Sequence, residues 1–135
     1  MGANYSAYPL KFFDRDNGIS WLRSCGLELP TPLPFSRDPS PDELRTVLDH
    51  LAACRVEYRV GDDGFDAEVR NSADESDWAV IWVNFRDSPK DRPLESIFFH
   101  RGTNEMVFRI VRELAKVCGP FVVAISQEEW HLVTQ

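Results

Sequence analysis

One stretch in the middle of the chain can adopt only one kind of regular structure. Between Arg55 and Arg70 every second residue is apolar, and the alternation continues on both sides of a Gly-Asp-Asp-Gly turn. Strict alternation is typical of a strand with one buried and one solvated face. Two such strands joined by a short glycine-flanked turn form a hairpin, and this register places Arg59 opposite Asp66. The sequence therefore predicts an antiparallel hairpin.

Helix signals lie on both sides of this hairpin. Ser40-Pro41-Asp42-Glu43 combines a capping box with a proline at the first helical position, and apolar residues then recur at helical spacing to about Cys54. A second amphipathic helix begins at Thr103 and ends at Gly119. A shorter helix is expected between Asn17 and Gly26.

Further strands complete the predicted sheet. They are expected at Trp78–Arg86, Ser96–His100, Phe121–Ile125 and Trp130–Thr134. Because Trp78–Arg86 is apolar on both faces, it is expected to be central and covered on both sides. The order is helix, helix, four strands, helix, two strands, which predicts an α+β fold with a mainly antiparallel sheet of about six strands and two or three helices.

The 135 residues are expected to form one domain, in which residues 1–39 are a proline-rich arm packed on a core of residues 40–135. Five prolines between Pro30 and Pro41 forbid a helix there and favour extended chain, with Leu33 and Phe35 tucked in. If the arm does not cover the second face of the sheet, four aromatic residues form an exposed patch of the type that marks an interface. These are Trp78, Trp82, Phe98 and Trp130.

Negative charge is concentrated in the segment from Gly61 to Trp78. It holds seven acidic residues and one arginine, and so accounts for −6 of the net charge of −7. Such a field attracts a positively charged partner and repels nucleic acid. Two other interpretations are open. The segment could be a solvated loop that keeps the protein soluble. It could also bind a divalent cation at Asp62-Asp63-Gly64 and Asp66, although the 12-residue calcium loop is absent. The acids are Asp62, Asp63, Asp66, Glu68, Asp74, Glu75 and Asp77.

Motifs for catalysis or metal binding are weak. His50, His100 and His131 are far apart, and the three cysteines, Cys25, Cys54 and Cys118, form no C-x-x-C pair. Neither a cofactor nor a metal is therefore expected. The segment from His100 and Arg101 into Thr103 leads from a strand to a helix N-terminus, which favours either an anion site or a simple helix start.

In size, acidity and layout the chain resembles the small intracellular immunity proteins with which bacteria neutralise toxins delivered by their neighbours. The resemblance implies an acidic binding protein, not an enzyme, whose seven acids face a basic toxin or effector, with Trp78 as an aromatic anchor. Two alternatives stay open. One is a secretion chaperone for an exported effector, and the other is a small enzyme with a site near His100 and Arg101.

Composition bounds the remaining expectations. Few, scattered cysteines fit a reducing compartment, so a cytoplasmic location is expected. The longest apolar runs are too short to span a bilayer, so no membrane partner is expected. A homodimer is possible.

Overall fold

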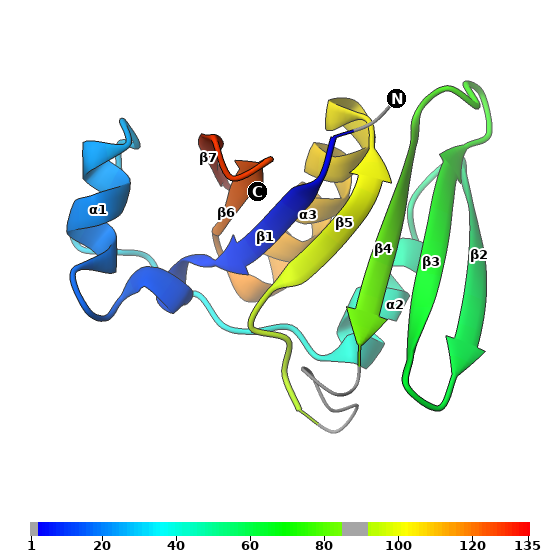
Figure 1. The fold of residues 1–135 in the computed structure, drawn as a ribbon, viewed down its shortest axis with the longest axis horizontal. Coiled ribbons are helices and arrows are strands. Elements are labelled where there is room, and N and C mark those ends of the chain that lie inside the picture. Colours follow the sequence, from blue (N-terminus) through cyan, green and yellow to red (C-terminus); the bar gives the residue numbers. More distant parts are fainter. Residues whose placement is uncertain (1–2, 85–91) are drawn as a thin grey trace.

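A computed structural model describes residues 3–84 and 92–135 as an α+β fold. Two helices, α2 and α3, cover one face of a seven-stranded, wholly antiparallel sheet (Figure 1). The fold class predicted from the sequence is confirmed. The elements are β1 (Tyr5–Pro9), a 3-10 helix η1 (Leu10–Phe13), α1 (Gly18–Ser24), α2 (Pro41–Asp49), β2 (Cys54–Gly61), β3 (Gly64–Asn71), β4 (Trp78–Asn84), β5 (Ile97–Gly102), α3 (Asn104–Cys118), β6 (Phe121–Ile125) and β7 (Glu129–Val133).

The sheet contains one strand that the sequence analysis did not predict. Its order is β2-β3-β4-β5-β1-β6-β7, so β1 lies in its middle and pairs with β5 and β6. Residues 5–9 of the expected arm are thus part of the sheet, which has seven strands rather than about six. The predicted strand at Trp78–Arg86 is β4 as far as Asn84, and its last two residues lie outside the described part of the chain.

The hairpin predicted from the alternation is formed by β2 and β3. Arg59 lies opposite Asp66, as the register required. Residues Asp62 and Asp63 make the two-residue connection between Gly61 and Gly64. The apolar side chains of both strands face α2, and the charged ones point to the opposite side of the sheet.

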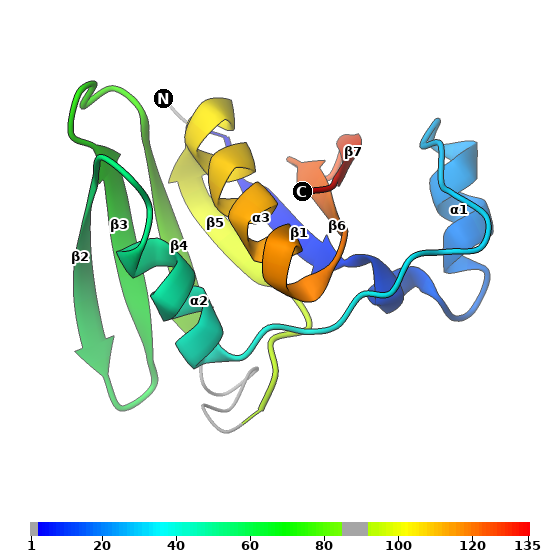
Figure 2. The ribbon, with the colours of Figure 1, turned by 180° about the vertical axis from the view of Figure 1, so that it is seen from behind.

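The rest of the arm crosses to the opposite side of the sheet at its β6–β7 end. Leu10, Phe13 and Leu22 form a second apolar cluster with Val122 of β6. The ring of Trp21 meets that of Trp130 edge to face at 4.7 Å. The extended segment after α1, residues 25–40, runs from the far side of β7 back to the start of α2 (Figure 2). Leu33 packs against this second cluster as expected, but Phe35 is exposed, so its predicted burial was wrong.

The start of α2 is fixed by the predicted capping box. The Ser40 hydroxyl accepts a hydrogen bond from the Glu43 N–H at 3.1 Å, and the Glu43 carboxylate accepts one from the Ser40 N–H at 3.0 Å. Arg37 adds two hydrogen bonds to the same carboxylate, at 2.8 and 2.6 Å. The helix ends at Asp49, five residues before the predicted end near Cys54, because the chain turns there to enter β2.

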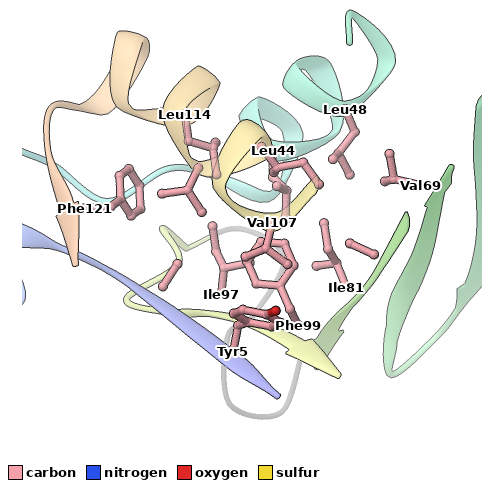
Figure 3. Packing of buried hydrophobic residues seen from close by; sticks show 14 of the residues in the cluster. Tyr5, Leu44, Leu48, Val69, Ile81, Ile97, Phe99, Val107, Leu114 and Phe121 are labelled. Carbon is pink, nitrogen blue, oxygen red and sulfur yellow. The ribbon is translucent and has the colours of Figure 1, made fainter. Parts of the chain in front are cut away.

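The main core lies between the helices and the sheet. Figure 3 shows Leu44 and Leu48 of α2 and Val107 and Leu114 of α3 pointing toward side chains from β1, β3, β4, β5 and β6. All of these helix residues are buried. The helices therefore cover the face of the sheet that carries the larger part of the apolar residues, and burial of this face is the main source of stability.

The Arg37–Glu43 pair predicts a specific dependence of stability on pH. The hydrogen bonds from Arg37 lower the pKa of Glu43 to about 2. Because the pKa is lower in the folded state, the charged form contributes stability above the ordinary carboxyl pKa near 4.5. That contribution is lost as the pH falls from about 4.5 to about 2.

We expect Glu43→Gln to lower the free energy of unfolding by about 1 kcal/mol at pH 7, since the pair is partly exposed. Urea titrations of both proteins at several pH values measure the difference. It should shrink steadily below pH 4.5 and vanish near pH 2. A difference that is the same at pH 7 and pH 2 would contradict the assigned role of the charge.

Candidate functional site

The outer face of the sheet, opposite α2 and α3, is left uncovered by the described residues over β3, β4 and β5. Figure 1 looks onto this face, and no described segment crosses these three strands. Trp82 of β4 is 47% exposed, and its neighbour Phe98 of β5 is also exposed. The expectation that β4 is covered on both sides was therefore wrong, because the described part of the arm packs over β1, β6 and β7 and does not extend to β4. It covers Trp130, and it leaves Trp82 and Phe98 open to solvent.

An irregularity in β5 adds the side chain of His100 to this face. The register between β4 and β5 shifts between Val80 and Ile81, where Val80 lies opposite Arg101 and Ile81 lies opposite Phe99. His100 is the extra residue of the resulting bulge. Its ring stacks on that of Trp82, with centroids 4.0 Å apart and an interplanar angle of 11°. Bulges commonly re-aim side chains next to functional sites.

The seven acidic residues do not form a single surface. Asp62 and Asp63 lie in the β2–β3 turn, at one end of β3, whereas Asp74, Glu75 and Asp77 lie between β3 and β4, at the other end. The eight residues of β3 separate the two groups by about 25 Å. The segment that is continuous in sequence is therefore divided between two regions of the molecule.

The group at the β2–β3 turn borders the aromatic residues of the outer face. A shallow hollow of about 560 Å³ is lined there by Asp62, Asp63, Asp66, Arg59 and Trp82, among others. Within the described residues, none of the three aspartates forms an ion pair or a side-chain hydrogen bond. Among the described residues that line it, the hollow thus has three carboxylates and one guanidinium beside an exposed indole, and these groups together make a negative field.

The group at the other end of β3 is engaged within the chain. Asp77 is buried, and its carboxylate accepts hydrogen bonds from the Thr103 hydroxyl at 2.6 Å and from the Asn71 amide at 3.2 Å. Asp74 accepts from the hydroxyl and the N–H of Ser76, which lowers the pKa of its carboxyl. Glu75 forms an ion pair with Arg55 at 2.5 Å.

Of the two other residues of the predicted partner surface, Glu68 lies in the middle of β3, and Trp78 lies at the β3–β4 end, next to Asp77 and opposite Arg70. Glu68 of β3 forms an ion pair with Arg70, and the Arg70 guanidinium also lies over the ring of Trp78, 5.6 Å from its centroid. Both residues are partly exposed. Of the eight residues proposed from the sequence, Asp62, Asp63 and Asp66 lie together. Trp82, Phe98 and His100 are the neighbours that belong to the same region but were not in that set.

At the start of α3, near His100, the helix is capped by the chain's own side chains. Thr103 is the N-cap of α3, and its hydroxyl accepts from the Met106 N–H at 3.3 Å. The carboxylate of Asp77 lies against the same hydroxyl. The chain itself therefore places a negative charge at the positive end of α3.

The other candidate groups are dispersed. Cys118 is buried in the main core, which raises the pKa of its thiol, and the Cys54 sulfur lies 3.2 Å from the Arg109 guanidinium. Within residues 3–84 and 92–135, no three side chains of His, Cys, Asp or Glu come together in a way that could hold a metal ion. None of the helices in this described part has the length and apolar character needed to cross a membrane.

The position of Asp77 predicts that it acts on stability. Asp77→Ala removes the acceptors of two partly buried donors, the Thr103 hydroxyl and the Asn71 amide, so we expect the free energy of unfolding to fall by about 1–3 kcal/mol. Asp77→Asn keeps an oxygen for the Thr103 hydroxyl and should cost less. Asp74→Ala, at an exposed position in the same loop, is the matched control and should lower the urea midpoint less than Asp77→Ala. Equal urea midpoints for Asp77→Ala and the parent protein would contradict this role.

Comparison with known proteins gives no relative. No family model, no curated protein and no solved structure matches this chain. The residues of the outer face and of the β2–β3 turn are therefore the basis for inferring the function.

Proposed function

We propose that this protein binds a basic protein and covers its positively charged surface, as an immunity protein neutralises a toxin. The observation that carries this proposal is the hollow at the β2–β3 turn. Three aspartates without an ion-pair partner among the described residues line it beside the exposed Trp82. Lysine or arginine side chains of a partner would enter this hollow.

The chemistry of the hollow favours a cationic side chain on a protein over a small ligand. Carboxylates form charge-assisted hydrogen bonds with guanidinium and ammonium groups. An indole face attracts the same cations, and tryptophan is among the residues that contribute most to protein interfaces. The hollow is shallow and continues into the flat surface of β4 and β5, where Phe98 and the His100–Trp82 stack offer apolar area to a partner.

The proposal narrows the set of acids given by the sequence. Asp62, Asp63 and Asp66 are retained as partner-binding residues, with Trp82 in place of Trp78 as the aromatic anchor. Asp77 is left out because it is buried, and Asp74 and Glu75 are left out because they lie at the far end of β3. Trp78 is left out because it lies at this far end too, opposite Arg70, and Glu68, in the middle of β3, lies at the margin of the proposed surface.

A selection from a displayed library of random peptides tests the proposal directly, because it samples every peptide charge. We expect the parent protein to recover sequences enriched in arginine and lysine. The triple variant Asp62→Asn/Asp63→Asn/Asp66→Asn should bind a recovered peptide at least about tenfold more weakly, with a smaller dependence on salt. The double variant Asp74→Asn/Glu75→Gln is the matched control and should bind like the parent.

The aromatic anchor is tested by the same measurement. Trp82→Ala should weaken binding of the recovered peptide by about tenfold or more. Trp21→Ala is its control, because Trp21 is 44% exposed on the arm and far from the hollow, and Trp82 is 47% exposed. Enrichment of acidic or uncharged peptides, or equal losses in both tryptophan variants, would count against the proposal.

A further inference from the structure

The strand β2 forms one edge of the sheet, and nothing in the described chain pairs with its outer side. It is eight residues long and contains neither lysine nor proline, the residues that usually block such an edge. Figures 1 and 2 show β2 at the rim, with α2 lying over its inner neighbours. The Tyr58 hydroxyl donates to Asp49 of α2 at 2.7 Å, which holds this strand against the helix.

The hydrogen-bond pattern identifies which backbone groups are free. Ser72 N–H donates to the Ala53 carbonyl at 2.7 Å, and the pairing of β2 with β3 continues this register. Bonded and non-bonded pairs alternate in an antiparallel ladder. Odd-numbered residues of β2 therefore bond to β3, and the N–H and C=O groups of Val56, Tyr58 and Val60 point outward.

The side chains of these three residues are only partly covered by the rest of the described chain. Val56 and Tyr58 are half-buried, and Val60 is 64% exposed. On the other face of the strand, Glu57 and Arg59 are exposed, and neither forms an ion pair with a described residue. The edge thus offers free backbone groups, apolar side chains and two opposite charges.

We propose that a second copy of this chain pairs with β2, so that the two sheets join across a two-fold axis at Tyr58. In this antiparallel register Glu57 of each copy faces Arg59 of the other, and Val56 faces Val60. About six backbone hydrogen bonds form, two at each outward pair. A two-fold axis at Glu57 would instead place Glu57 opposite its own copy and Arg55 opposite Arg59, which the repulsion between like charges disfavours.

Mass measured by light scattering at increasing concentration tests the proposal. We expect the parent protein to approach about 31 kDa, twice the 15.5 kDa of one chain, between 1 and 500 µM. Val60→Lys should raise the dissociation constant at least about tenfold, because it introduces a charge at an apolar pair of the new ladder. Val117→Lys, at a 48% exposed position on α3, is the control and should leave it unchanged.

Charge exchange tests the register. Glu57→Arg replaces the two Glu57–Arg59 pairs across the axis with two pairs of like charge and should weaken the dimer about tenfold. Glu57→Arg combined with Arg59→Glu should restore the dissociation constant to within about threefold of the parent value. Glu28→Arg, on the arm, is the control for net charge. A protein that stays monomeric to 500 µM, or a dimer unaffected by Val60→Lys, overturns the proposal. Because the readout is mass, it is independent of the binding of basic peptides.

Discussion

Burial of one face of the sheet under α2 and α3 is the constraint on which the rest of the structure depends. Buried residues from both helices and from six strands, all but β2, meet in one core, part of which Figure 3 shows. The described part of the arm contributes a second, smaller cluster on the opposite face, over β1, β6 and β7. The aromatic residues of β4 and β5 are exposed as a direct result of this unequal cover.

The bare surface and the negative charge meet at one place, the β2–β3 turn. Trp82 brings apolar area to this end of the sheet, and Asp62, Asp63 and Asp66 bring charge that nothing in the described chain neutralises by contact. The remaining acids have roles within the fold. Asp77 joins the β3–β4 loop to the start of α3, and Glu75 holds the same loop to Arg55 of β2.

Local signals account for what the sequence could predict. The hairpin followed from alternation around a glycine-flanked turn, and the starts of α2 and α3 followed from their caps, since each pattern lies within a few residues. The strand β1 has five residues and no such signal, and its partners are distant, because Tyr5 pairs with Phe99 and with Ile125. Nothing in the local sequence indicates these pairings.

Only the local features of the candidate site could be predicted from the sequence. The turn acids and the apolar outer face of β4 could be read from the sequence, but whether the arm covers that face depends on tertiary packing. The division of the acids follows from the length of β3, which the predicted hairpin already implied. The burial of Asp77 depends on Thr103, 26 residues further along the chain, so its role could not be predicted.

The most direct test of the binding surface is a titration of the ¹⁵N-labelled protein with an arginine-rich peptide, followed by NMR. The account predicts that the Trp82 indole and the amides of Asp62, Asp63 and Asp66 shift together and saturate, while those of Asp74 and Glu75 do not move. Shifts confined to the β3–β4 loop, or spread evenly over all exposed acids, would contradict it.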